Sequence, residues 1–313
     1  MNDTDQGDPG RAWWTGWLGA VPDPSGGFEV GAAAARGGAR RCPIRLMSYG
    51  TTIEAVLFAP DVPGPLPAVV VPFYDVGSVF GERTPRTEGW TDERRRARAY
   101  GNHLVARGVA VLAVPWWFEQ VADRAASATS LHERYGPAAA RHEATLPMTG
   151  LGRSLGDLML AVDALLSVPW VDPARVGAFG HSLGAKLALH LAALDVRIGA
   201  AVAHEPGLGF AHSNWSDPWY LGTRIPAGRD QHELLGLIGR RPFLLAGGGA
   251  SDGGHNEHLV ERARLAGGAA GLETLYHDSG HDHPIHVLVA CYAWLTARLA
   301  AGDALLPERK PFT

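Results

Sequence analysis

The stretch Gly180-His181-Ser182-Leu183-Gly184 is the most informative part of the chain. It lies between a short apolar run, 175–179, and an Ala- and Leu-rich stretch, 185–193, so its G-x-S-x-G pattern falls where a strand is expected to pass into a helix. Glycines two residues either side of the serine let the strand and the helix pass closely, which exposes the serine hydroxyl on a sharp turn. The pattern predicts a nucleophile elbow with Ser182 as the nucleophile. The next backbone N–H, that of Leu183, is the expected donor to an oxyanion.

Apolar runs and helical patterns alternate along the chain from Ile44 onward. Continuous apolar runs predict buried strands, and apolar residues at helical spacing predict helices. The expected strands cover residues 44–49, 52–59, 67–73, 109–114, 176–180, 198–203, 242–246 and 272–277. The expected helices cover residues 91–107, 155–166, 185–193, 256–265 and 284–299. This alternation predicts an α/β fold with a mostly parallel central sheet and helices on both faces.

Three segments do not follow the alternation. Residues 1–41 are rich in Gly, Ala and Pro, and we interpret them as an N-terminal extension lying on a single domain that covers 42–313. Two insertions, about 116–150 and 205–241, each follow an expected strand. Because insertions at the carboxyl ends of strands lie over the ligand crevice of an open α/β sheet, both are predicted to form a cap.

The composition argues against several classes of function. A net charge of −4 gives no general attraction to nucleic acid or to an anionic membrane. No stretch approaches the length of a membrane span, and the acidic N-terminus has no basic and apolar leader, so a cytoplasmic location is expected. Two distant cysteines, Cys42 and Cys291, fit neither a disulfide framework nor a metal site. The run Arg94-Arg95-Arg96 is interpreted as the solvated face of a mixed-charge helix. The sequence is compatible with a homo-oligomer but does not fix the oligomeric state.

A nucleophilic serine needs an imidazole to take its proton. His281 is the best candidate, because it lies in a loop after the last expected strand and before the final helix. His283 and His286 are less suitable because they enter that helix. The His and Asp residues of this loop also resemble a metal site, but no second cluster of matching spacing accompanies them, so neither a metal nor another cofactor is expected.

Two acids compete to orient His281. Asp252 follows the expected strand 242–246 through a glycine-rich approach, which suits a tight turn that exposes a carboxylate at a strand end. Glu205 follows the preceding strand and could reach the same imidazole from the other side. The sequence favours Asp252 and keeps Glu205 as the alternative.

The second donor to the oxyanion is expected in the loop after the strand 67–73. No His-Gly pair occurs there, so we assign the donor to the backbone N–H of Phe73 or Tyr74. The Tyr74 hydroxyl is a further candidate.

The chain resembles the α/β-hydrolase superfamily, and within it the dienelactone-hydrolase and acetyl-xylan-esterase-like group, over roughly residues 44–299. The most specific likeness is the lead into the penultimate strand, His232-Glu233-Leu234-Leu235-Gly236-Leu237-Ile238-Gly239-Arg240-Arg241-Pro242. Dienelactone hydrolases use a cysteine nucleophile where this chain has Ser182, so their lactone substrate is not implied.

A partial likeness to glucuronoyl esterases also exists. Lys186 keeps the position of a lysine that follows their serine by four residues, and His204-Glu205-Pro206-Gly207 is similar to their acid loop. The glycine of their elbow is displaced, because Ala185 stands third after the serine. The likeness supports Glu205 as an acid and Lys186 as a substrate-binding residue.

These observations together predict a serine hydrolase that cleaves a carboxylic ester, most simply a deacetylase or small-acyl esterase acting on a small molecule through an acyl-enzyme. An acyltransferase, a thioesterase and a peptidase could use the same triad, and a catalytically silent binding protein could retain the fold. Aromatic residues of the predicted cap are expected to line the substrate pocket: Trp117, Trp215 and Trp219.

Overall fold

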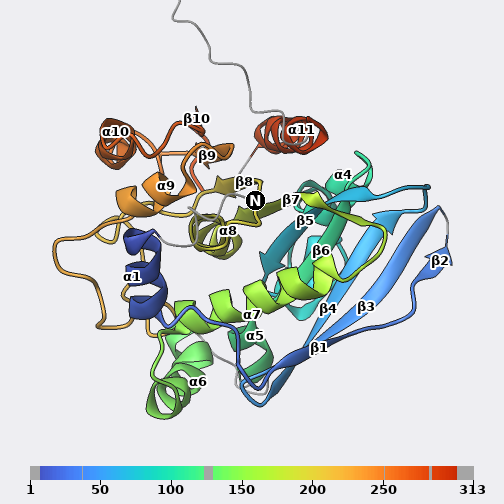
Figure 1. Cartoon of the computed structure of the whole chain (residues 1–313), viewed down its shortest axis with the longest axis horizontal. Helices are drawn as coiled ribbons and strands as arrows, with labels where there is room; N and C mark the ends of the chain where they lie inside the picture. The colour runs from blue at the N-terminus through green and yellow to red at the C-terminus, as the bar shows by residue number, and fades with distance from the viewer. Residues whose placement is uncertain (1–7, 37, 123–129, 250, 282–283, 302–313) are drawn as a thin grey trace, which may run out of the picture.

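A ten-stranded mixed sheet runs through the molecule (Figure 1). The computed structural model describes residues 8–36, 38–122, 130–249, 251–281 and 284–301. The strand order is β1-β3-β4-β6-β5-β7-β8-β9-β10, and β2 also pairs with β3. The strands are β1 (Gly27–Val30), β2 (Ala34–Arg36), β3 (Ala39–Ser48), β4 (Thr51–Pro60), β5 (Leu66–Phe73), β6 (Ala110–Pro115), β7 (Val171–His181), β8 (Ala200–His204), β9 (Phe243–Gly247) and β10 (Leu272–Tyr276).

The sheet has an antiparallel part and a parallel part. β3 and β4 form a hairpin whose two turn residues, Tyr49 and Gly50, have positive φ values of 46° and 72°. Such turns match the right-handed twist of the strands they join. From β6 through β5, β7, β8, β9 and β10, all neighbours are parallel. The carboxyl ends of these strands therefore meet along one edge of the sheet, where ligands bind in open α/β folds.

Helices cover both faces of the sheet. α7 and α8 pack on one face together with α1 and α9, while α4 and α11 pack on the other (Figure 1). The helices are α1 (Pro9–Leu18), α2 (Val76–Val79), α3 (Asp92–Ala97), α4 (Tyr100–Val105), α5 (Trp117–Val121), α6 (Leu131–Thr145), α7 (Gly150–Leu166), α8 (Leu183–Leu194), α9 (His232–Ile238), α10 (Glu257–Leu265) and α11 (Ile285–Ala300). A 3₁₀ helix, η1, covers Pro85–Thr87. The predicted α/β class, with a mostly parallel sheet between helical layers, is confirmed.

The core explains the sequence pattern of the central strands. β5 and β6 are buried along nearly their whole length, which is why their sequences are continuous apolar runs. α8 is buried at every position because it crosses the middle of the sheet beneath other helices. Within the described residues, no helix has the length and apolar content needed to cross a bilayer.

The N-terminal segment packs on the rest of the molecule through α1 and through the strands β1 and β2. α1 packs on α8 and α9, and its Trp14 and Leu18 side chains are fully buried. The Arg11 guanidinium donates hydrogen bonds to the carbonyl oxygens of Ala193 (3.0 Å) and Leu237 (2.8 Å). β1 and β2 then extend the sheet by pairing with β3.

The segment between β5 and β6 differs from its prediction. One helix was expected over residues 91–107, but the structure has two short helices, α3 and α4, interrupted at Arg98 and Ala99. Arg98 is buried at this break. Because the helix is interrupted, the Arg98 side chain turns toward the edge of the sheet. In a continuous helix with a solvent-exposed face, it would have stayed outside.

Candidate active site

Ser182 lies on a strained turn between β7 and α8. Its backbone has φ 56° and ψ −116°, a region that residues with a side chain rarely adopt. A Cβ on Gly180 would lie 1.9 Å from the carbonyl oxygen of Gly184, and a Cβ on Gly184 would lie 2.4 Å from that of Pro72. Both glycines are therefore required for the strand, the helix and β5 to approach one another. The structure has the geometry of a nucleophile elbow at the predicted serine.

His281 contacts the serine directly. Its Nε2 lies 3.0 Å from Ser182 Oγ, although the two residues are 99 positions apart in sequence. The imidazole comes from the loop between β10 and α11, as expected, and 47% of its side chain is exposed. For Nε2 to accept the serine proton, Nδ1 must carry the ring hydrogen. The group that faces Nδ1 therefore decides the tautomer.

Two groups face Nδ1 of His281. The hydroxyl oxygen of Ser251 lies 3.0 Å away, and Oε2 of Glu205 lies 3.7 Å away. A hydroxyl can accept the N–H hydrogen bond, but it cannot compensate the positive charge that the ring gains when it takes a proton. Glu205 can, because its carboxylate carries a negative charge. Catalytic hydrogen bonds are often long without a bound substrate, so 3.7 Å is compatible with an orienting role.

The surroundings of Glu205 suit the stabilisation of a nearby positive charge rather than the stabilisation of the fold. Its side chain is 0% exposed, and neither carboxylate oxygen has a hydrogen-bond partner within the described part of the chain. Its backbone φ is 61°, so Glu205 shares with Ser182 and Tyr49 a positive φ that the other described non-glycine residues lack. A buried carboxylate without hydrogen bonds on a strained backbone is costly to folding, which is typical of a functional position.

Asp252, the acid that the sequence favoured, lies elsewhere. Its carboxylate accepts hydrogen bonds from the backbone N–H groups of Gly207 and Leu208, each at 2.8 Å, and from the Asn256 side chain at 3.0 Å. Burial raises the pKa of Asp252, and these hydrogen bonds act in the opposite direction. The side chain thus joins the loop after β9 to the loop after β8. The structure replaces Asp252 by the alternative acid, Glu205, as the carboxylate beside His281.

A chain of histidines lies beneath the site. His181 Nδ1 is 2.9 Å from His204 Nδ1, and His204 Nε2 is 3.0 Å from His277 Nε2. Burial lowers the pKa of His204 to about 3, and burial also lowers the pKa of His277. The chain ends at Glu205, whose Oε1 lies 3.6 Å from His277 Nε2. Neutral imidazoles that alternate as donor and acceptor satisfy these contacts.

The same side chains form a group with metal-ligand spacing. Among the described residues, the ligand atoms of His204, Glu205 and His277 lie within 4.8 Å of one another. His204 and His277 share a hydrogen bond through their Nε2 atoms. Within the described residues, the two histidines therefore satisfy one another, while the Glu205 carboxylate contacts His277 at 3.6 Å without a hydrogen bond.

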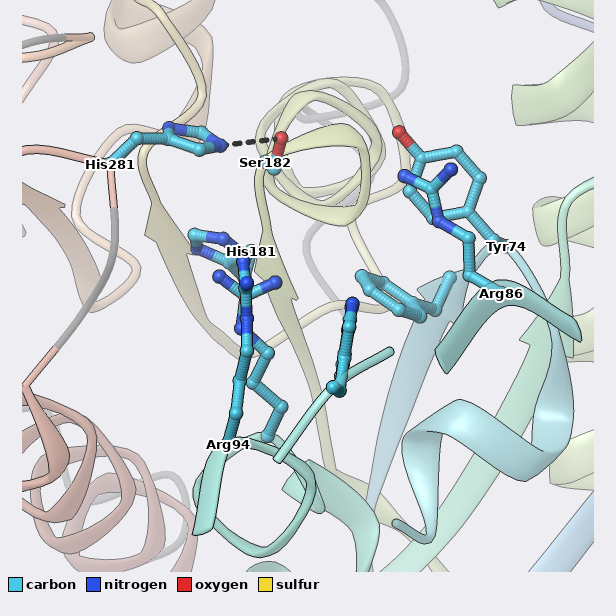
Figure 2. Close-up of a pocket in the computed structure, with 9 residues that line it drawn as sticks. Tyr74, Arg86, Arg94, His181, Ser182 and His281 are labelled. Atoms are coloured by element: carbon cyan, nitrogen blue, oxygen red, sulfur yellow. Dashed lines mark hydrogen bonds between the residues drawn. The ribbon is translucent and has the colours of Figure 1, made fainter. Parts of the chain in front are cut away.

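A cavity of about 380 Å³ opens beside the serine (Figure 2). His281 stands on one side of Ser182, and Tyr74 with Arg86 stands on the other. The residues that line the cavity are Phe73, Tyr74, Arg86, Trp90, Arg94, Arg98, His181, Ser182 and His281. Phe73 and Tyr74, proposed from the sequence as oxyanion donors, are therefore at the site, and the Tyr74 ring packs edge-on against Phe73 and Trp116. Leu183 follows Ser182 at the start of α8, as the elbow requires.

The predicted substrate-binding tryptophans lie in the hydrophobic core instead. Trp215 and Trp219 are buried, and Trp215 Nε1 donates to the carbonyl oxygen of Gly207 at 2.7 Å. Trp117 Nε1 donates to Thr51 Oγ1 at 3.2 Å. None of the three is among the residues that line the cavity. Their aromatic rings pack the two predicted cap segments together, as the contact between Tyr135 and Trp219 illustrates.

Lys186 also turns away from the cavity. Its ammonium donates to the carbonyl oxygen of Pro206 at 2.8 Å and to Ser213 Oγ at 2.9 Å, and it lies 3.8 Å from the centre of the Trp215 ring. Burial lowers the pKa of Lys186 to about 7, although the negative charge of Asp252 partly opposes this. Lys186 therefore stabilises the turn that contains Glu205 and does not line this cavity.

Sequence reasoning missed the wall of the cavity formed by the segment between β5 and β6. Arg86, Trp90, Arg94 and Arg98 line the site, and Arg94 belongs to the run that was interpreted as solvent-facing. Arg94 is exposed as well as lining the cavity, whereas the Arg95 side chain is only 11% exposed, pairs with Asp92 and donates a hydrogen bond to the carbonyl oxygen of Trp90 at 3.0 Å. The available signal was position: this segment follows β5, whose carboxyl end supplies Phe73 and Tyr74.

Comparisons with known proteins agree with this geometry. The sequence pattern of the acetyl xylan esterase family matches residues 153–214, which include the elbow and Glu205. No curated protein matches the sequence significantly. Solved structures with a similar fold include a glucuronoyl esterase from Solibacter usitatus, with a TM-score of 0.67 and 14% identity over 95% of this chain and 94% of that one.

Two further structures extend the likeness. A promiscuous esterase from a marine bacterial metagenome has a TM-score of 0.69 and 16% identity, covering 95% of this chain and 93% of that one. Acetyl xylan esterase 1 from Thermoanaerobacterium sp. JW/SL YS485 has a TM-score of 0.58 and 16% identity, covering 93% and 94%. The chain has an α/β-hydrolase fold, which it shares with acetyl xylan esterases and glucuronoyl esterases of solved structure.

Proposed function

We propose that the protein is a serine hydrolase that cleaves a carboxylic ester through an acyl-enzyme. The observation that carries the proposal is the 3.0 Å contact between His281 Nε2 and the hydroxyl of Ser182, on a strained elbow at the edge of the sheet. The match to the acetyl xylan esterase family supports a small acyl group such as acetyl.

The chemistry follows from the positions of the groups. His281 Nε2 takes the proton of Ser182 as the serine oxygen attacks the ester carbonyl, and Glu205 stabilises the imidazolium that forms. Backbone N–H groups of Leu183 and of Phe73 or Tyr74 bind the oxyanion. His281 then gives its proton to the leaving alcohol, and an acyl group remains on Ser182. A water molecule, deprotonated by the same imidazole, releases the acid.

Ser182→Ala tests this function with a matched control. Pre-steady-state hydrolysis of 4-nitrophenyl acetate by the wild-type protein should show a burst of about one 4-nitrophenol per active site if deacylation is slower than acylation. Ser182→Ala should abolish the burst and lower kcat by on the order of 10⁴ or more, with unchanged folding by circular dichroism.

Ser251→Ala is the control, because Ser251 also contacts His281 but through Nδ1. It should retain the acyl-enzyme, which intact-mass measurement after acid quenching detects. If Ser182→Ala still formed an acyl-enzyme, Ser182 would not be the nucleophile.

A further inference from the structure

The imidazole of His281 lies between two serine hydroxyls. Ser182 Oγ is 3.0 Å from Nε2 (Figure 2), and Ser251 Oγ is 3.0 Å from Nδ1. Glu205 Oε2 is farther from Nδ1, at 3.7 Å, and its carboxylate has no hydrogen-bond partner among the described residues. A hydrogen bond fixes a direction because it needs a short distance and a near-linear angle, whereas the attraction between two charges does not. Within the described part of the chain, Ser251 is therefore the group that can direct the Nδ1 side of the ring.

The ring of His281 needs such a direction because much of it is open to solvent. Its side chain is 47% exposed, and its ring packs on that of His181, with 5.0 Å between the ring centres. A half-turn about the Cβ–Cγ bond would place a carbon atom opposite Ser182 instead of Nε2, and the base would be lost. A hydrogen bond at Nδ1 opposes that turn, because the same rotation would break it.

Buried neighbours fix the main chain at Ser251. The residue follows β9, and its carbonyl oxygen accepts a hydrogen bond from Asn256 Nδ2 at 3.1 Å. The same amide group donates to Asp252 Oδ1 at 3.0 Å, and both Asn256 and Asp252 are 0% exposed. The sequence predicted that the loop after β9 presents a side chain to His281. The structure does so with Ser251, one residue before the predicted Asp252, which turns inward.

We propose that Ser251 is a positioning residue that holds His281 in its reactive orientation, while Glu205 supplies the negative charge that stabilises the imidazolium. In a catalytic triad the carboxylate performs both tasks. Here a hydroxyl within hydrogen-bond distance and a buried carboxylate beyond it divide them. Because a hydroxyl both donates and accepts, Ser251 alone permits either tautomer, and the charge of Glu205 favours the one with hydrogen on Nδ1. This inference rests on the proposed function, since it concerns the base that serves Ser182.

Removing the hydroxyl should slow the reaction without weakening substrate binding. Ser251→Ala should lower kcat for 4-nitrophenyl acetate by about tenfold, the effect of one lost hydrogen bond. Its KM should stay within about twofold, because Ser251 does not line the cavity, and the acyl-enzyme should still form on Ser182. Ser251→Thr keeps the hydroxyl and should remain within about threefold of the wild-type kcat. Ser279→Ala is the control with unchanged kcat, since Ser279 precedes His281 by two residues but contacts His277 through its backbone N–H.

A carboxylate at position 251 tests the division of tasks. A negative charge close to Nδ1 favours the protonated ring, so Ser251→Asp should move the acid limb of kcat/KM to higher pH. Ser251→Asn has nearly the same size without the charge and should leave that limb in place. In the Glu205→Gln background, Ser251→Asp should raise kcat by about tenfold or more, because one residue then performs both tasks, and Ser251→Asn should not.

The two proposals fail in different ways. A wild-type kcat in Ser251→Ala, or a Ser251→Thr variant as slow as Ser251→Ala, would refute the role of the Ser251 hydroxyl while Ser182 remains the nucleophile. The same conclusion would follow if Ser251→Asp neither moved the acid limb nor raised the kcat of Glu205→Gln. Hydrolysis that persists in Ser182→Ala would overturn the hydrolase function instead.

Discussion

At the scale of single residues, the two acids near the site lie in different environments. Glu205 lies beside His281 and has no hydrogen-bond partner among the described residues, whereas the Asp252 carboxylate accepts three hydrogen bonds from other groups. A carboxylate that stabilises an imidazolium matters to the rate, and one that satisfies backbone N–H groups matters to folding. Amide substitutions should therefore separate catalysis from stability.

Glu205→Gln should lower kcat by about a thousandfold or more, because an amide cannot stabilise the imidazolium of His281. Its free energy of unfolding should stay equal or rise, since a buried carboxylate without hydrogen bonds is replaced by a neutral group. Steady-state kinetics and urea denaturation of the same preparation measure both quantities.

Asp252→Asn is the counterpart. It should reduce the free energy of unfolding by about 1–3 kcal/mol, because one of the two carboxylate oxygens that accept a backbone N–H becomes a donor. Its kcat should stay within about tenfold of the wild type. If Asp252→Asn cost more activity than Glu205→Gln, the assignment of the acid would be reversed.

The sequence could not separate these acids, for a physical reason. Both follow strands whose carboxyl ends lie at the same edge of the sheet, so position alone admits either. The glycine run before Asp252 was read as support for that residue, yet a Cβ on Gly248 would lie 2.7 Å from Glu205 Oε1 and 2.2 Å from the Gly280 carbonyl oxygen. That glycine makes room for Glu205 and for the loop of His281, a role that only the folded contacts reveal.

At the scale of elements, β8 and β10 bring a buried histidine pair beneath the site. His204 ends β8 and His277 follows β10, and the two rings share a hydrogen bond. Burial lowers the pKa of His204 to about 3 in the folded state. Between pH 3 and about pH 6.5, the folded state therefore binds fewer protons at His204 than the unfolded state does. The stability contributed by neutral His204 is therefore complete above pH 6.5 and is lost progressively as the pH falls toward 3.

The dependence of the free energy of unfolding on pH tests this role of His204. Between pH 6.5 and 4.5, the wild-type protein should lose up to about 1.4 kcal/mol per pH unit from His204 alone. Urea denaturation at each pH should show that the free energy of unfolding of His204→Gln depends less steeply on pH, whatever its value at pH 7.5. His258→Gln, at an exposed position on α10, serves as the control and should keep the wild-type slope. An unchanged slope in His204→Gln would show that His204 is protonated in the folded state or is not a source of acid sensitivity.

Element boundaries show where sequence reasoning succeeds. The strands β5, β6 and β9 match their apolar runs closely, because burial on both faces leaves a continuous apolar signal. The expected single helix over 91–107 is interrupted at Arg98, whose guanidinium lies 4.8 Å from the centre of the Trp90 ring, a tertiary contact that local periodicity does not encode.

At the scale of the whole molecule, the alternation of strands and helices predicts the sheet and hence the edge where the site lies. Ser182 and His281, 99 residues apart, could be paired from the sequence because the elbow and the last loop have fixed places in such a sheet. The wall of the cavity beside Ser182 was less predictable. Trp215 and Trp219 are buried in the packing of the two insertions, while the wall of the cavity comes from the segment after β5.

The reactivity of Ser182 toward a fluorophosphonate tests the central claim most directly. The wild-type protein should gain one covalent adduct, which peptide mapping by mass spectrometry places on Ser182, and urea-unfolded protein should gain none because a serine without its imidazole is a weak nucleophile. His281→Ala should react far more slowly. No adduct on the folded wild-type protein, or an adduct on another residue, would contradict the account.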